Sequence, residues 1–298
     1  MNKADIYLEN DFIKIGVNYH GAELRSLVKK TNDLEYLWKA DKEFWGRTSP
    51  VLFPFVGKVN DNSYSYDGRV YENIPQHAFA RDYDFELVEK NTTSILFKLD
   101  ADETTKALYP FDFTLKIGYE LRESSVKVSW TVENKDSKQM YFSIGAHPAF
   151  NCPKLDTDDI NFDGYMIDLG IKANSIKSGL IGSKGTLTDI TRDVTLDNGL
   201  IRLNQDTFKS DALILDGKEV NKVSILDKNK KPYLSVKFDM PLVGIWAPAK
   251  ENVPFVCIEP WCGRCDRESF NGDLADREYG NKLEIGESFN QSYEIILE

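Results

Sequence analysis

The stretch FTLKIGYELRESSVKVSWTV, residues 113–132, decides the fold class of this chain. Apolar and polar side chains alternate on both sides of a polar centre, RESS, at residues 122–125. Alternation with a period of two is typical of a β-strand that buries one face. The apolar positions are Phe113, Leu115, Ile117, Tyr119, Leu121, Val126, Val128, Trp130 and Val132. We therefore predict two antiparallel strands joined by a tight turn, with Trp130 in the core.

Similar patterns recur along the chain and indicate an all-β protein. Further runs with strand character lie at residues 12–17, 94–99, 212–215, 223–226, 233–238, 255–261 and 289–295. The polar segment 227–232 predicts a second hairpin. Short helices are expected near residues 42–45 and 272–278. The polar segment 171–198, which contains several glycines, is expected to form long connections with short strands.

The chain as a whole reads as one domain, because no repeat, low-complexity tract or flexible linker divides residues 1–298. Many short strands with polar turns favour one large antiparallel β-sandwich or barrel with few short helices. The net charge of −11 argues against a nucleic-acid partner. The sequence contains neither a membrane-spanning apolar run nor an apolar signal segment at its start, so we expect a cytoplasmic protein. Nucleotide-binding glycine motifs and the G-x-S-x-G motif are also missing.

The four cysteines are Cys152, Cys257, Cys262 and Cys265. Disulfides are not expected in a protein of this kind. Cys262 and Cys265 form a C-x-x-C pair, but a zinc site would need further ligands that the pattern does not supply. We expect reduced thiols and no metal.

One carboxylate stands in unusual surroundings, within VPFVCIEPWCGRCD at residues 253–266. If this segment is a strand, Cys257, Glu259 and Trp261 share a face with Phe255. Burying an ionised carboxylate among apolar side chains is costly unless it is paired or hydrogen-bonded. Glu259 is therefore either a member of a structural ion pair or an acid/base group with a shifted pKa.

Two of the three histidines lie in segments of the same character. His77 lies in IPQHAFARD, residues 74–82, and His147 lies in YFSIGAHPAF, residues 141–150. In a strand, Gly145 and His147 share a face, and we expect Gly145 to leave room for a ligand beside the imidazole. Such a histidine is either structural or an acid/base group suited to neutral pH.

Six short motifs together resemble the aldose 1-epimerase (galactose mutarotase-like) family, in particular its LacX-like branch. They are GAEL at 21–24, FPFVGKV at 53–59, QHAFARD at 76–82, GAHPAF at 145–150, SDAL at 210–213 and CIEPW at 257–261. The resemblance implies a large antiparallel β-sandwich with a sugar site on its concave face. It also implies an isomerase of carbohydrate metabolism that needs no cofactor.

The resemblance assigns roles to particular residues. Glu259 matches the family's base, His147 its acid, and His77 a group that contacts the sugar near the ring oxygen. Asp211 matches an aspartate that binds sugar hydroxyls. Two positions depart from the family pattern. Lys58, a candidate for binding the sugar, stands where the family has an arginine, which replaces a planar bidentate donor with a point charge. Ala78 stands where glycine is usual, so that its methyl group would narrow the pocket or shift the backbone.

Mutarotation removes a proton from the C1 hydroxyl and adds one to the ring oxygen, so a carboxylate and an imidazolium suit it. We expect Glu259 to be ionised and His147 protonated at rest, each stabilised by the other. Trp246 and Trp261 are candidates for stacking on the sugar. Arg47 and Arg81, with Arg264, are candidates for binding a phosphate.

Three alternatives remain beside a hexose 1-epimerase. In the first, the substrate is a hexose 6-phosphate. In the second, the protein binds a sugar without catalysing a reaction. The third is glycoside hydrolysis by Glu259 with Asp211, which requires two carboxylates about 5–9.5 Å apart.

Overall fold

The hairpin predicted at residues 113–132 lies within the larger of two main sheets. In the computed structural model, which describes residues 2–298, strands β10 (Phe113–Arg122) and β11 (Ser125–Asn134) pair antiparallel along their whole length. Trp130 is 2% exposed, which confirms its place in the core. The second predicted hairpin is also present, between β20 (Lys222–Leu226) and β21 (Pro232–Phe238).

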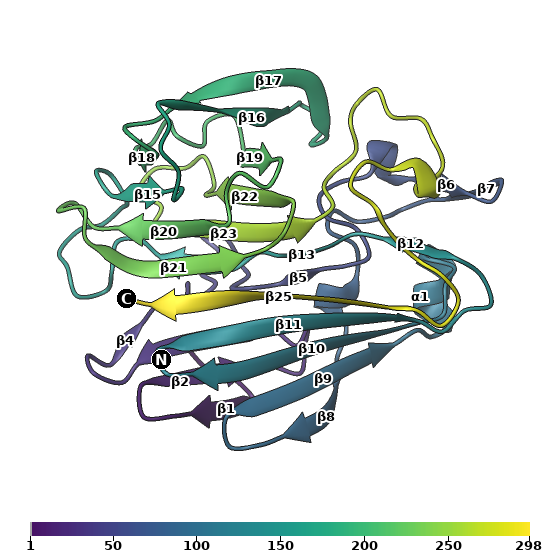
Figure 1. The fold of residues 1–298 in the computed structure, drawn as a ribbon, viewed down its shortest axis with the longest axis horizontal. Helices are drawn as coiled ribbons and strands as arrows, with labels where there is room; N and C mark the ends of the chain where they lie inside the picture. Colours follow the sequence, from purple (N-terminus) through teal and green to yellow (C-terminus); the bar gives the residue numbers. More distant parts are fainter. Residues whose placement is uncertain (1) are drawn as a thin grey trace.

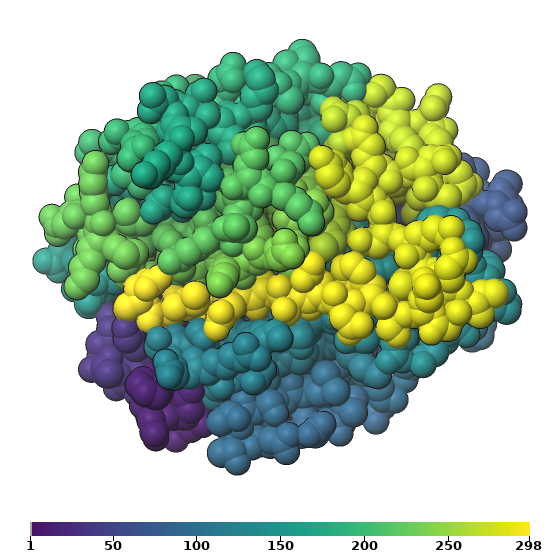
Figure 2. Space-filling view, in the orientation of Figure 1, coloured from purple at the N-terminus to yellow at the C-terminus, as the bar shows by residue number. Residues whose placement is uncertain are grey.

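The larger sheet has nine strands and crosses the front of Figure 1. Its order is β18 (Leu200–Arg202), β15 (Met166–Asp168), β20, β21, β25 (Ser288–Leu297), β11, β10, β9 (Ser94–Asp100) and β8 (Glu86–Lys90). Strand β25 comes from the end of the sequence and lies in the middle of the sheet. Figure 2 shows it as a yellow band between the green surface of β20 and β21 and the blue-green surface of β10 and β11.

The second sheet has eight strands and runs from the top of Figure 1 to behind the first sheet. Its order is β17 (Leu187–Thr195), β16 (Ser175–Ile181), β19 (Leu213–Asp216), β22 (Leu242–Trp246), β23 (Phe255–Cys262), β13 (Ile144–Ala146) and β5 (Val51–Leu52), and β14 (Ala149–Asn151) also pairs with β23. All ladder pairings between the named strands of residues 2–298 are antiparallel, as predicted for an antiparallel β-sandwich.

Smaller elements complete the structure. A four-stranded sheet is formed by β1 (Ile6–Glu9), β2 (Ile13–Val17), β3 (Leu24–Lys29) and β4 (Leu34–Glu35), and two-stranded sheets by β6 (Tyr64–Tyr66) with β7 (Arg69–Tyr71) and by β12 (Met140–Phe142) with β24 (Asn281–Leu283). The helical elements are α1 (Glu103–Leu108) and the 3-10 turns η1 (Asn60–Asn62), η2 (Ala80–Asp82) and η3 (Leu274–Asp276). Among residues 2–298, none of the helices has the length and apolarity needed to cross a membrane.

The eight-stranded sheet uses its two faces differently. Along β19, Leu213 and Leu215 belong to the main hydrophobic core, whereas Ile214 belongs to a smaller cluster on the opposite face. Val243 and Leu242 alternate in the same way along β22. One face therefore packs in the core, and the other is available for a site.

Three local predictions need correction, and one short helix was not predicted. Residues 171–198 hold two long strands, β16 and β17, rather than short ones. Much of β17 is exposed, so its sequence lacks a clear apolar face. Residues 42–45 form a single turn, in which the Trp45 N–H donates to the carbonyl of Asp41, 2.9 Å away. Helix α1 was missed because six residues are too short for helical periodicity to register, although Asp102 and Thr105 form a capping box at its start. The helix expected near 272–278 is the short turn η3.

Candidate active site

A cavity of about 460 Å³ opens on the face of the eight-stranded sheet that carries the smaller cluster. Adjacent strands supply its polar groups. Glu259 lies in β23, Trp246 ends β22, His147 follows β13, and Asp211 precedes β19. The lining residues are Trp45, Arg47, Val56, Gly57, Gln76, His77, Arg81, His147, Ile181, Gly185, Asp211, Ala212, Ile214, Trp246, Glu259, Trp261 and Cys265. The fold thus gathers seven of the eight site residues predicted from the sequence, all except Lys58.

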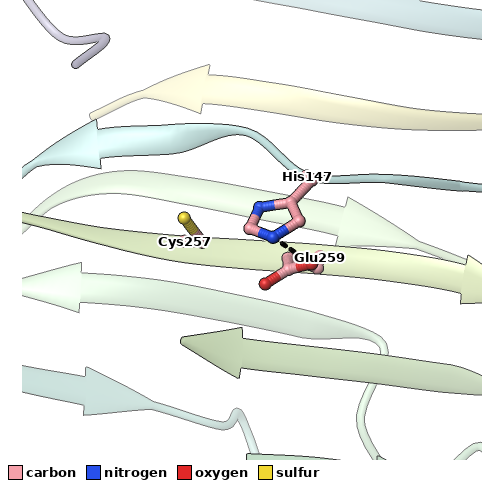
Figure 3. A group of neighbouring side chains, drawn as sticks. All are labelled: His147, Cys257 and Glu259. Carbon is pink, nitrogen blue, oxygen red and sulfur yellow. Dashed lines mark ion pairs between the residues drawn. The ribbon is translucent and has the colours of Figure 1, made fainter. Parts of the chain in front are cut away.

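Glu259 and His147 form the centre of the cavity wall. His147 Nε2 lies 3.3 Å from Glu259 Oε2 (Figure 3). The two residues are only 2% and 7% exposed. The pair is held by the sheet itself, because Glu259 is opposite Gly244 in the ladder and the His147 N–H donates to the carbonyl of Pro50.

Burial governs the protonation of this pair, contrary to the sequence-based expectation. It raises the pKa of Glu259 well above its usual value, and the negative charge of Asp211 acts in the same direction. Burial and the positive charge of Arg81 lower the pKa of His147 to about 3. The favoured resting form is a neutral carboxylic acid beside a neutral imidazole. Attraction between the two charges favours an ion pair, but the cost of removing both charges from water opposes it.

The neutral pair still holds one transferable proton. Moving that proton from Glu259 to His147 produces a carboxylate and an imidazolium without changing the net charge. The pair can therefore release a proton on one side and accept one on the other, as acid/base chemistry requires.

His77 is fixed in one tautomer. The backbone N–H of Gly57 donates to His77 Nδ1 at 3.0 Å, so in the neutral ring the proton resides on Nε2. Burial, with the charge of Arg81, lowers the pKa of His77 well below its usual value. His77 can therefore offer a neutral Nε2–H donor to a ligand.

The alanine that follows His77 has a conformational explanation. His77 and Ala78 have φ angles of 65° and 54°, in the left-handed region where glycine is most easily accommodated. Ala78 is fully buried and is not among the residues that line the cavity. The methyl group therefore does not narrow the pocket as anticipated, and the preference for glycine at this position reflects the backbone.

Arg47 and Arg81 place two guanidinium groups on the cavity wall. Arg47 pairs with Asp82 at 2.8 Å, and Arg81 donates to the carbonyl of Gln76 at 2.5 Å. Burial and the charge of Arg47 lower the pKa of Arg81 to about 10. Arg264, the third candidate, lies elsewhere: it pairs with Glu278 and lines a separate cavity of about 310 Å³.

Lys58 does not line the cavity, which corrects the prediction of a direct sugar contact. Its ammonium donates to the carbonyl of Lys184, 2.9 Å away, at the tip of the β16–β17 hairpin. Gly185, next in that tip, does line the cavity. Lys58 therefore acts on the cavity wall indirectly, by holding the hairpin.

Gly145 makes room for Trp261 and not for a ligand, which corrects a second expectation. A Cβ at Gly145 would lie 2.5 Å from Trp261 Cδ1, and a Cβ at Gly244 would lie 2.5 Å from Trp261 Cη2. The indole therefore lies against glycines of β13 and β22, the strands on either side of β23. Its Nε1–H donates to the carbonyl of Ala146 at 3.2 Å. Trp261 forms part of the cavity floor.

Trp45 was missed by sequence reasoning. Its ring stacks on the His147 imidazole with 4.7 Å between centroids and 25° between planes. Trp45 is placed two residues before Arg47, on the loop between β4 and β5. That proximity was the only signal available in the sequence. The carboxylate of Glu23 secures the same loop by accepting from the N–H groups of Thr48 and Ser49.

Cys257 lies close to the central pair. Three possible metal-ligand atoms lie within 4.8 Å of one another, one each from His147, Cys257 and Glu259. Figure 3 shows these side chains. Metal binding would require the deprotonated thiol and carboxyl. Burial raises the pKa of Cys257 well above its usual value. The donor set therefore favours a shared proton over a metal ion. All four cysteines are buried and unpaired.

Comparison with known proteins gives a consistent result. The aldose 1-epimerase family matches residues 5–295 of this chain. The chromosomal LacX protein of Lactococcus lactis subsp. lactis is 28% identical over 304 residues, which cover 98% of this chain and 99% of LacX.

Two solved structures agree closely with this fold. A galactose mutarotase related enzyme from Lactobacillus acidophilus has a TM-score of 0.91 at 34% identity, over 99% of this chain and 97% of that one. A galactose mutarotase-like protein from Lactobacillus casei ATCC 334 also has a TM-score of 0.91, at 31% identity, over 98% of this chain and 99% of that one.

Proposed function

This chain belongs to the aldose 1-epimerase family, and on that premise we propose that it interconverts the α and β anomers of a free hexose. The observation that carries the proposal is the Glu259–His147 contact of 3.3 Å in the wall of a 460 Å³ cavity. That volume falls in the range of about 300–1,000 Å³ usual for small-molecule sites. A buried acid/base pair with one transferable proton is what anomer exchange requires.

The reaction proceeds through the open-chain aldehyde. The proton first moves from Glu259 to His147, and Glu259 then takes the proton of the C1 hydroxyl as His147 protonates the ring oxygen. The bond between C1 and the ring oxygen breaks, and the aldehyde turns about its C1–C2 bond. The same groups run the steps in reverse on the other carbonyl face.

Other cavity groups hold the sugar in place for this exchange. The Nε2–H of His77 serves as a donor near the ring oxygen, where negative charge develops. The carboxylate of Asp211 accepts from sugar hydroxyls. Trp246 and Trp261 offer apolar faces to the pyranose ring.

Polarimetry tests the proposal directly. Freshly dissolved α-glucose and α-galactose should approach their equilibrium rotations faster with the protein than in buffer. Glu259→Gln should lower the rate by at least about 10²-fold, the typical contribution of an acid/base group, while circular dichroism stays unchanged. No acceleration with either sugar or with further aldoses would refute the proposal. A sugar-induced rise in melting temperature without acceleration would instead favour a non-catalytic binding protein.

A hexose 6-phosphate is a second candidate substrate, favoured by the two guanidinium groups of Arg47 and Arg81. Both guanidinium groups line the cavity, so a phosphate there would meet two positive charges, although Asp82 lies 2.8 Å from Arg47 and 3.7 Å from Arg81 Nε. Glucose 6-phosphate should then have a higher kcat/KM than glucose, and Arg81→Met should abolish the preference. Arg122→Met, in an exposed ion pair away from the cavity, is the matched control.

A further inference from the structure

The imidazole of His147 lacks the hydrogen bond that usually orients a catalytic histidine. Its Nε2 faces Glu259, and its Nδ1 is buried without a hydrogen-bond partner. Histidines in acid/base roles are commonly held by a carboxylate or carbonyl at the second nitrogen. Some other contact must fix this ring.

Aromatic rings surround the imidazole in place of that hydrogen bond. Trp45 stacks on its face at 4.7 Å. Trp246 and His77 meet it nearly at right angles, with centroids 5.4 Å and 5.5 Å away. Of these three rings, Trp45 alone lies parallel to the imidazole, so it opposes rotation of the ring out of its plane.

Trp45 is itself held in position by contacts of its backbone and its ring. Its backbone N–H donates to Asp41, and its carbonyl accepts from Trp38 Nε1 at 2.8 Å. The ammonium of Lys250 donates to the carbonyl of Glu43 in the same turn, at 2.7 Å. Phe255 of β23 lies roughly parallel to Trp45, with centroids 6.1 Å apart. The loop therefore presents a fixed aromatic face to His147.

The same face compensates for an unfavourable electrostatic setting. The charged or titratable groups around the imidazole are Glu259 and Cys257 from β23, His77 and Arg81 from the segment 76–82, and Arg47 from the β4–β5 loop. The two arginines repel an imidazolium. An indole face attracts one, because the negative charge of its π system faces the cation.

We propose that Trp45 is a positioning residue of the epimerase, whose indole face holds the His147 imidazole in plane and stabilises the imidazolium formed when Glu259 gives up its proton. The inference rests on the proposed function for its kinetic consequence. Its structural consequence, the order of the imidazole, does not depend on activity. The two can therefore fail separately.

The kinetic test compares Trp45→Leu, Trp45→Phe and Trp246→Leu. Loss of the stacked face in Trp45→Leu should lower kcat for anomer exchange by about 2- to 30-fold, the range of a cation–π contact, with KM changed less than kcat. Trp45→Phe keeps an aromatic face and should recover most of the loss. Trp246→Leu removes a cavity wall that meets the imidazole edge-on, so it should mainly raise KM.

The second measurement is the order parameter of the His147 Cε1–H bond by ¹³C relaxation, with the signal assigned from His147→Asn. The order parameter should fall in Trp45→Leu and be restored in Trp45→Phe. An unchanged order parameter in Trp45→Leu, or a rise in KM with constant kcat, would overturn the inference. If the wild-type protein does not accelerate anomer exchange of any aldose but the order parameter falls in Trp45→Leu, the proposed function fails and the positioning role stands.

Discussion

Replacing Gly145 with alanine should destabilise the protein through a clash with one side chain. The new Cβ would lie 2.5 Å from Trp261 Cδ1 and 3.1 Å from Val56 Cγ2. The indole cannot simply shift away from residue 145, because its far edge already lies against Gly244. Shifting it also breaks the bond from Trp261 Nε1 to the carbonyl of Ala146.

The magnitude follows from these two effects. Overpacking a core costs about 1–3 kcal/mol, and a buried donor left without a partner costs about 1–3 kcal/mol. The free energy of unfolding should therefore fall by about 2–6 kcal/mol. In a chain of this size the melting temperature should drop by roughly 3–10 °C.

Thermal unfolding followed by circular dichroism, together with urea titration, measures the effect. Gly46→Ala is the matched control, because its Cβ would meet only the flexible side chain of Lys42, at 3.3 Å. The double variant Gly145→Ala/Trp261→Leu should be more stable than the sum of the single effects predicts, since removing the indole removes the clash. A melting temperature of Gly145→Ala within 1 °C of wild type, or strict additivity in the double variant, would refute the reasoning.

Two further predictions concern the cavity. Because burial lowers the pKa of His147 to about 3, below the usual histidine value of about 6.5, the unfolded chain binds a proton in this window that the folded protein does not, so the contribution of His147 to stability falls as the pH drops through it. Between pH 6.5 and 5, the free energy of unfolding from urea titrations should fall by about 2 kcal/mol more in the wild type than in His147→Asn. Equal changes in the two proteins would contradict the sign. Lys58→Met should raise KM by roughly 5-fold at constant kcat, as expected for losing one hydrogen bond to the hairpin tip. Lys184→Ala keeps the carbonyl that Lys58 binds and should leave KM near wild type, and an equal rise in both variants would argue against the contact.

The parts of the fold that the sequence predicts are those written into local patterns. The β10–β11 hairpin follows from alternation on either side of a polar turn, and its register needs no distant partner. The order of short motifs brought Glu259 and His147 forward as a pair. Both inferences depend on residues near one another in the sequence or on a family resemblance.

What the sequence could not supply depends on contacts between distant segments. The space beside Gly145 is filled by Trp261 from another strand, and Lys58 reaches Lys184 at the tip of the distant β16–β17 hairpin. The protonation of Glu259 follows from complete burial, which no local pattern encodes. Trp45 becomes visible as a neighbour of His147 only after the β4–β5 loop has folded over the sheet.

The position of β25 has a consequence for biosynthesis. Residues 288–297 pair with β11 on one side and β21 on the other, so they join two groups of strands that are made much earlier. While the ribosome is still adding the residues before β25, β8–β11 and β20–β21 present unpaired edges in this sheet. Such edges promote pairing between nascent chains. The growing polypeptide therefore exposes the edges of β11 and β21 in this sheet until β25 emerges.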